Sequence, residues 1–231
     1  PNGLILAGTA PCSGPFPASV PNPVAGEYCL IVSNGNCADT ACVDVEVLEI
    51  PFVENGIVSG GGDYCEGADA TLSATIVNPS GGDIDYVWTQ NGNPISTGTA
   101  PSGTTISLEL LGLELSDGGQ YCLELTCVTT GCQSDGDDCA TVVVLQAVQN
   151  LIATGGGDYC EGVNVPLNGS SDPGPGNVTY TWTGPGFNFS STAPNGGPYP
   201  ATVTAISVNQ SGVYVLVVES ADGCIDSASV V

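Results

Sequence analysis

The octet GGGDYCEG stands at Gly60–Gly67, and the same eight residues return at Gly155–Gly162. The two copies start 155 − 60 = 95 residues apart, which is about the length of one small domain. A second marker returns at nearly the same spacing: GEYCLIV from Gly26, GQYCLEL from Gly119 and GVYVLVV from Gly212. Repeats of this length indicate a tandem array of domains.

Between the two markers lies a third, DYVW ending at Trp88 and TYTW ending at Trp182. The three markers divide the chain into unit one (1–52), unit two (53–147) and unit three (148–231). Unit one holds only the later half of the pattern, because it contains neither the octet nor a tryptophan. We therefore expect the chain to be an excerpt of a longer secreted protein that continues upstream.

Hydrophobic residues alternate with polar ones inside each unit, which predicts half-buried β-strands. Sequences typical of turns, such as NPSGGD, NGNP and SDGG, separate these stretches. Several short strands with frequent turns in about 95 residues predict an all-β, antiparallel two-sheet sandwich for each unit. The inward positions expected in unit two are Leu72, Ala74, Ile76, Tyr86, Trp88, Ile106, Leu108, Leu110, Tyr121, Leu123, Leu125, Val142 and Val144.

The composition limits what the chain can bind and where it can work. Its 24 acidic residues are accompanied by no Lys, Arg or His, so the chain lacks the cations that hold nucleic acids and anionic membranes. A hydrophobic fraction of 42% argues against disorder, and no apolar run is long enough for direct membrane insertion. Eleven cysteines indicate an oxidising compartment, so we expect an extracellular or cell-surface location.

The motifs resemble a known group of domains. Asp117-Gly-Gly-Gln-Tyr121 resembles the tyrosine corner of immunoglobulin-like (Ig-like) domains, Trp88 takes the place of their central tryptophan, and Leu72 and Leu123 stand where their inter-sheet disulfide would be. The layout resembles the Ig-like and PKD-like repeats of giant Bacteroidetes surface adhesins, with Tyr159-Cys-Glu-Gly in unit three as the best match. The resemblance implies tandem Ig-like sandwiches stapled by disulfides.

The resemblance also implies which cysteines pair within a unit. It joins the octet cysteine to the cysteine of the last hairpin, Cys65 to Cys132 in unit two and Cys160 to Cys224 in unit three. Cys37 occupies the same hairpin place in unit one, and its partner would lie in the missing half of that unit.

A second set of disulfides follows from the repeats themselves. Cys29 and Cys122 directly follow the corner tyrosine, and Cys42 and Cys139 precede inward residues of the last strand, so all four face outward. Both positions carry cysteine in units one and two, and neither does in unit three, which has Val215 and Ser229 there. This joint loss predicts Cys29–Cys42 and Cys122–Cys139 bridges. Cys12 and Cys127 remain, either as free or externally paired thiols or as a bridge between units or chains.

Acidic residues offer one candidate metal site. Asp135, Asp137 and Asp138 crowd one hairpin loop, and calcium takes oxygen ligands from such loops. A solvated polar turn is the alternative, and no other cofactor is expected. A zinc site is disfavoured because zinc prefers four nitrogen or sulfur ligands at close spacing and the chain has no histidine.

Catalysis is not expected, because without His and Lys only carboxylates, Tyr and Cys could transfer protons, and none stands in a recognisable catalytic context. Modification is a further hypothesis. Asp39-Thr-Ala41 and Asp226-Ser-Ala228 occupy equivalent places and resemble the O-glycan acceptor motif of Bacteroidetes, with Thr40 and Ser227 as the acceptors.

The sequence favours a non-enzymatic, extracellular structural or adhesive segment of a large bacterial surface protein. The first hypothesis is the repeat stalk of an adhesin, in which each domain meets only its neighbours in the same chain. The second is a subunit segment of an assembled filament or hook-like appendage, with further copies of itself as partners. A glycan-binding module is the third hypothesis, weakened because only four Phe and two Trp are present.

Overall fold

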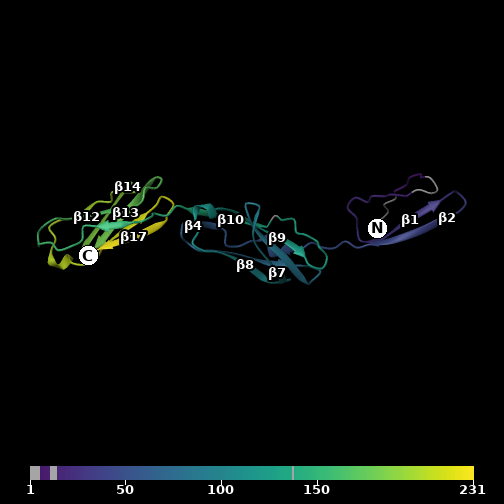
Figure 1. Ribbon diagram of the computed structural model, residues 1–231, viewed down its shortest axis with the longest axis horizontal. Helices are drawn as coiled ribbons and strands as arrows, with labels where there is room; N and C mark the ends of the chain where they lie inside the picture. The colour runs from purple at the N-terminus through teal and green to yellow at the C-terminus, as the bar shows by residue number, and fades with distance from the viewer. Residues whose placement is uncertain (1–5, 11–14, 137) are drawn as a thin grey trace.

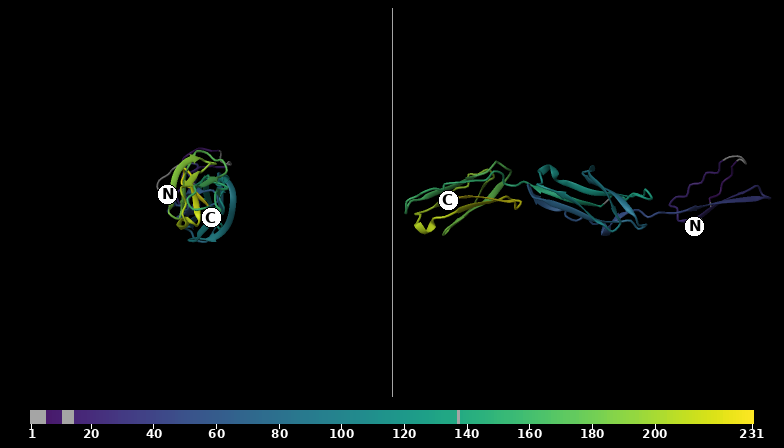
Figure 2. Two further views of the ribbon diagram at one scale, coloured as in Figure 1. Left: turned by 90° about the vertical axis from the view of Figure 1, so that its left-hand side faces the viewer. Right: turned by 60° about the horizontal axis from the view of Figure 1, so that its bottom comes forward.

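The computed structural model describes residues 6–10, 15–136 and 138–231, and it shows the three units in a row (Figure 1). The described residues form β-strands and short 3₁₀ turns. Among them, no helix is long and apolar enough to cross a membrane. The end-on view in Figure 2 is compact, whereas the side view is long and narrow, so the chain is an elongated string of sandwiches.

Unit one contributes a single antiparallel hairpin, β1 (Gly26–Ser33) paired with β2 (Ala38–Val45). Its apolar face is uncovered: Leu30 is 44% exposed and Val32 38% exposed. The matching residues of unit two, Leu123 and Leu125, are 0% and 1% exposed, because a second sheet covers them. The hairpin therefore has the pattern of half a sandwich.

Unit two is a two-sheet sandwich. A five-stranded sheet has the order β4-β10-β9-β6-β7, and a three-stranded sheet has the order β3-β5-β8. All neighbours are antiparallel except β4 and β10, which run parallel. The elements are β3 (Phe52–Val53), η1 (Glu54–Gly56), β4 (Gly62–Cys65), β5 (Ala70–Val77), β6 (Asp83–Gln90), β7 (Asn93–Pro101), β8 (Thr105–Leu110), η2 (Leu115–Asp117), β9 (Gly119–Cys127) and β10 (Cys139–Leu145).

Unit three repeats this plan with a four-stranded sheet, β14-β13-β16-β17, and a three-stranded sheet, β11-β12-β15. Within each of these sheets, hydrogen-bonded neighbours are antiparallel. The elements are β11 (Ile152–Thr154), β12 (Val165–Ser170), β13 (Asn177–Gly184), β14 (Phe187–Pro194), β15 (Ala201–Val203), η3 (Val208–Gln210), β16 (Tyr214–Glu219) and β17 (Ile225–Val230).

Each sandwich has its own hydrophobic core. The core of unit two is built around Trp88, which is 0% exposed, and that of unit three around Trp182, also 0% exposed. Leu72 and Leu123 are fully buried, as expected of residues that replace an inter-sheet disulfide. The expected inward positions of unit two all belong to its core or pack against it. The fold class is therefore all-β, with tandem antiparallel sandwiches as predicted.

The corner tyrosine makes the same hydrogen bond in all three units. The hydroxyl of Tyr28, Tyr121 or Tyr214 donates to the carbonyl oxygen four residues earlier, at 2.9, 2.7 and 2.9 Å. In unit two this bond ties the start of β9 to the η2 turn. Burial, and secondarily the nearby Asp117 carboxylate, raise the pKa of Tyr121, and burial raises the pKa of Tyr214.

Candidate functional site at the junction of units two and three

The octet builds one half of the junction, the end of unit two. Gly60 has φ +91°, and a Cβ atom there would lie 2.0 Å from the carbonyl oxygen of Thr71, so only glycine fits. The Tyr64 hydroxyl donates to the Gly60 carbonyl at 2.7 Å. The strand then runs parallel to β10, with Cys65 opposite Leu145. The octet thus places Cys65 at the end of β10, where the chain leaves unit two.

The β16–β17 turn builds the other half, on unit three. The Ser220 N–H donates to the Cys224 carbonyl at 2.8 Å, and the Cys224 N–H donates back to Ser220 Oγ at 3.1 Å. Gly223, with φ +86°, completes the turn and donates to the Ser220 carbonyl at 3.1 Å. These bonds hold Cys224 at the end of unit three that faces unit two.

A disulfide joins these two halves. Cys65 and Cys224 are bonded and lie 159 positions apart in sequence, and their Cα atoms are 5.7 Å apart, a separation typical of disulfides. Cys224 is 1% exposed and Cys65 is half-buried. Because each sandwich has its own core, the bond fixes one unit on the other rather than completing either fold.

This pairing differs from the one implied by resemblance. Cys65 is bonded to Cys224 rather than to Cys132, and both Cys132 and Cys160 are free thiols. The reason is the topology: β4 runs parallel to β10 and ends beside Leu145, whereas Cys132 precedes β10. A strand of seven residues spans roughly 20 Å, so the two cysteines lie at opposite ends of one sandwich. The octet cysteine of unit two can therefore bond with the hairpin cysteine of the next unit but not with that of its own unit.

The two bridges expected from the repeats are present. Cys29 is bonded to Cys42 and Cys122 to Cys139. In both cases the partners are directly opposite one another in the strand register. Cys127 is a free buried thiol, and Cys12 lies outside the described residues.

Neutral amides take the place of cations at the junction. Gln149 Nε2, in the linker, donates to Glu66 Oε2 of unit two at 2.8 Å. Asn150 Nδ2 donates to Asp172 Oδ2 of unit three at 2.7 Å, and the Asp172 N–H donates to the Gln149 carbonyl at 2.9 Å. In a chain without Lys or Arg, such amide donors are the available partners for carboxylates. The linker is therefore tied to both units.

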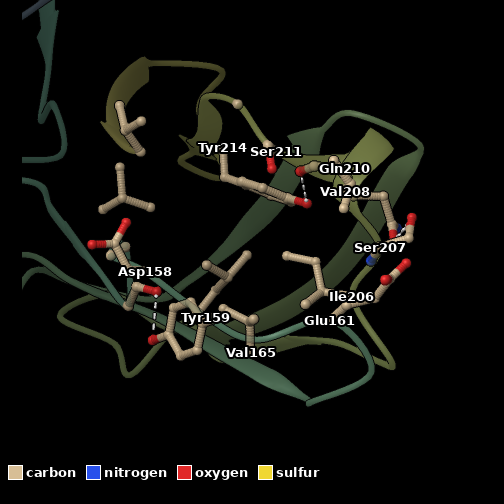
Figure 3. Close-up of a pocket in the computed structure, with 17 residues that line it drawn as sticks. Asp158, Tyr159, Glu161, Val165, Ile206, Ser207, Val208, Gln210, Ser211 and Tyr214 are labelled. Carbon is tan, nitrogen blue, oxygen red and sulfur yellow. Dashed lines mark hydrogen bonds between the residues drawn. The ribbon is translucent and has the colours of Figure 1, made fainter.

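A cavity of about 330 Å³ lies at the far end of unit three (Figure 3). Tyr159, Val165, Ile206 and Tyr214 line it, and both tyrosine hydroxyls are hydrogen-bonded to main-chain carbonyls. The same place in unit two is filled by Val142 and Val144 at the end of β10. Val230 and Val231 also line the cavity.

The acidic loop is only partly described. Asp138 Oδ2 accepts a hydrogen bond from the Val53 N–H at 3.4 Å, which ties the start of β10 to β3. Asp135 is exposed, and Asp137 lies outside the described residues. The calcium site at Asp135, Asp137 and Asp138 stays a prediction.

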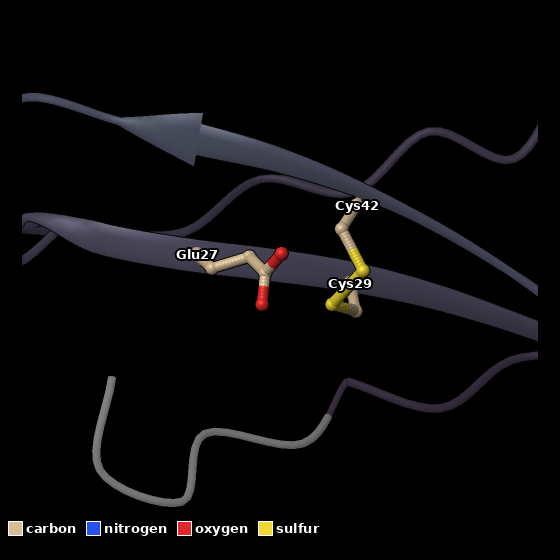
Figure 4. Close-up of side chains that lie close together, drawn as sticks. All are labelled: Glu27, Cys29 and Cys42. Atoms are coloured by element: carbon tan, nitrogen blue, oxygen red, sulfur yellow. A yellow bond between two sulfur atoms is a disulfide. The ribbon is translucent and has the colours of Figure 1, made fainter.

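One cluster elsewhere has metal-like geometry. Glu27 lies beside Cys29 and Cys42 on the outer face of unit one, with the ligand atoms within 4.8 Å of one another (Figure 4). Both sulfur atoms belong to a disulfide, and metals bind the thiolate form. This cluster is a bridge with a neighbouring carboxylate.

The two glycan acceptor motifs occupy the same register. Thr40 of β2 lies three residues before Val43, the strand partner of Tyr28, and Ser227 of β17 lies three residues before Val230, the strand partner of Tyr214. Both acceptor residues are exposed. In each motif the aspartate Oδ1 accepts a hydrogen bond from the N–H of the acceptor residue, at 2.9 and 2.7 Å. Glycosylation at these residues stays a prediction.

No protein-family model matches the chain, and no curated protein matches its sequence. The fold does match solved structures. The I-band fragment I67–I69 of titin aligns with a TM-score of 0.51 and 16% identity, covering 89% of this chain and 72% of that one. A mutated variant of the same three-Ig fragment gives 0.49 and 15%, with the same coverage. A structure of a 1.5-MDa bacterial ice-binding adhesin gives 0.39 and 14%, covering 88% and 71%.

The likeness to the titin fragment is one of fold. It shows that the sandwiches are Ig-like domains placed in series. The chain is thus an all-β array of tandem Ig-like domains stapled by disulfides.

Proposed function

We propose that this chain is a non-enzymatic structural segment of an extracellular protein, in which Ig-like units transmit force through covalently closed junctions. The observation that carries the proposal is the Cys65–Cys224 bond, which joins two separate cores. A disulfide between domains leaves both folds intact and removes bending at the linker. This is useful in a protein that must hold reach and shape.

The adhesin-repeat origin is part of this proposal. It is supported by the octet, the tryptophan strand and the corner tyrosine, which resemble repeats of Bacteroidetes surface adhesins. An oxidising, extracellular compartment is supported by three disulfides among the described residues. In this reading the partners of each domain are its neighbours in the chain.

An assembled appendage is the alternative, and one observation favours it. Cys37 and Cys160 are free and exposed, and they belong to loops at the two ends of the row of units. Both thiols are open to partners outside these residues, in further units of the same chain or in other copies of it.

Peptide mapping combined with small-angle scattering tests the proposal. Cleavage after glutamate of protein recovered from outside the cell should release residues 55–66 bonded to residues 220–231, because these fragments carry Cys65 and Cys224 alone. The unreduced protein should scatter as one stiff rod, and Cys65→Ser should scatter as a flexible chain of the same folded units. Identical scattering by the two proteins, or Cys65 bonded to Cys132, would contradict the proposal.

A further inference from the structure

The end of β9 makes a short antiparallel pairing with the segment that follows it in the chain. Thr126 lies opposite Gln133 in an antiparallel bridge. One residue closer to the turn, the Cys127 N–H donates to the Cys132 carbonyl at 2.9 Å. This register places Cys127 and Cys132 directly opposite one another across the base of the β9–β10 turn.

The two thiols belong to the same face of this pairing. Cys127 is the last inward residue of β9 and is 1% exposed. Opposite residues of an antiparallel pair direct their side chains to one face, and Cys132 is half-buried. At hydrogen-bonded positions of such a pair the Cα atoms lie about 5.5 Å apart, and disulfides span Cα separations of about 4.4–6.8 Å. The register therefore suits a bond between the two sulfur atoms.

The other two units have a polar residue in place of Cys127. Their turns differ in length, yet each is closed by an N–H that donates to the carbonyl of the hairpin cysteine. Asn34 donates to Cys37 at 3.1 Å, and Ser220 donates to Cys224 at 2.8 Å. Of the three units, unit two alone has a second cysteine at this position, so its hairpin cysteine faces a thiol.

We propose that Cys127 and Cys132 form a disulfide that closes the β9–β10 turn, at the end of unit two that faces unit one (Figure 1). Both residues are thiols in the structure, which is the reduced state of this pair. A closed pair removes Cys132 from any bond of the Cys65–Cys224 kind, whereas an open pair leaves it available. The inference rests on the proposed function in one respect, the oxidising compartment.

Exposure sets the order of the chemical steps. A small disulfide such as oxidised glutathione reaches the half-buried Cys132 before the buried Cys127. The Cys132 thiolate attacks one glutathione sulfur, breaks the glutathione S–S bond and releases one reduced glutathione. The Cys127 thiolate then attacks the Cys132 sulfur of this mixed disulfide and releases the other. Two protein thiols are oxidised, and one oxidised glutathione becomes two reduced molecules, which take up the two thiol protons.

Peptide mapping of the whole chain after equilibration in a glutathione redox buffer tests the proposal. Free thiols are blocked with iodoacetamide in denaturant, and cleavage after Glu and Asp then releases residues 125–135, whose cysteines are Cys127 and Cys132. The expected result is an unblocked peptide with a mass two hydrogens below that of its reduced form. Because the bond lies within one turn, the closed fraction should not change with protein concentration.

Two variants separate this pair from general thiol oxidation. Cys127→Ser removes the thiol that resolves the mixed disulfide, so glutathione should stay bonded to Cys132. Cys132→Ser leaves only the buried Cys127, which should carry no glutathione and should be blocked once the chain is denatured. Cys160→Ser is the matched control, because Cys160 is a free thiol outside this turn. It should leave the closed 125–135 peptide unchanged.

Several results would overturn the proposal: a wild-type 125–135 peptide with both cysteines blocked, glutathione retained on wild-type Cys132, or Cys132 bonded to a different peptide. The same digest reports separately on the Cys65–Cys224 bond, which appears as residues 64–66 bonded to residues 223–226. An open turn with that bond intact contradicts the turn disulfide alone, whereas loss of that bond contradicts the proposed function.

Discussion

Cys65 ends the first edge strand of unit two, Cys224 stands in the last hairpin turn of unit three, and a disulfide bonds the two residues across 159 positions of sequence. In the proposed force-bearing role, a pull on the ends of the chain would pass from Cys65 to Cys224 through sulfur. Most of both sandwiches lies in the bypassed segment. In that role the disulfide would carry the pulling force past the folded units.

The first prediction concerns the octet. Gly60→Ala would place a Cβ atom 2.0 Å from the Thr71 carbonyl oxygen, so we expect it to destabilise unit two by more than about 3 kcal/mol. Gly67→Ala is the matched control, because Gly67 has a similar φ of +86° but nothing within 4 Å of the added carbon. Its cost should stay near 1–2 kcal/mol. Urea unfolding of the two variants measures the difference, and equal costs would contradict the packing argument.

The second prediction compares the two core tryptophans. Trp182 Nε1 donates to the Tyr199 carbonyl at 2.9 Å, whereas Trp88 Nε1 is buried without a partner among the described residues. Replacing Trp182 by Phe leaves that carbonyl unpaired, whereas replacing Trp88 by Phe removes an unpaired donor. Trp88→Phe should therefore cost about 1–2 kcal/mol less than Trp182→Phe. Thermal unfolding followed by calorimetry gives both values, and the reverse order would count against this account of the cores.

The third prediction concerns the tyrosine corner. Tyr121→Phe removes the 2.7 Å hydrogen bond to the Asp117 carbonyl and leaves the ring in the core. We expect a loss of about 1–2 kcal/mol in the free energy of unfolding of unit two, with no change in unit three. Denaturant unfolding monitored by tryptophan fluorescence measures this. A Trp182→Phe background leaves Trp88 to report on unit two, and a Trp88→Phe background leaves Trp182 to report on unit three. A neutral Tyr121→Phe would show that the corner bond contributes nothing.

The fourth prediction follows from the raised pKa values of Tyr121 and Tyr214. The folded chain keeps these phenols protonated above the pKa of about 10 that they have when unfolded. Their stabilisation is therefore complete below pH 10 and is lost as the pH rises through the folded pKa. The Tyr121→Phe, Tyr214→Phe double variant should show a flatter decline in stability as the pH rises above 10. A decline as steep as that of the parent protein would refute the assignment.

The sandwich and its inward residues could be predicted from sequence, because alternation reports directly on which side of a strand faces a core. The Cys29–Cys42 and Cys122–Cys139 bridges could also be predicted, because both cysteines of a pair disappear together in unit three. These bridges join positions that lie opposite one another within a single hairpin, so local pattern suffices.

The Cys65–Cys224 bond could not be predicted in the same way. Repeats show which two positions of a unit carry cysteine, but not which copy of each position is bonded. The missing information is direction: β4 runs parallel to β10 and so ends at the opposite end of the sandwich from Cys132. The Trp182–Tyr199 hydrogen bond was likewise missed, because it depends on a loop of unit three that has no counterpart in the repeat markers.

Stretching single molecules by their two ends tests the central claim most directly. In the unreduced protein, the Cys65–Cys224 bond should prevent the segment between the two cysteines from extending, so unfolding should not release its length. In the presence of reductant, or with Cys65→Ser, the same segment should extend in separate steps for units two and three, by on the order of 500 Å in total. An unreduced protein that releases the full length would show that force passes through the sandwiches and not through the disulfide, and would contradict the account.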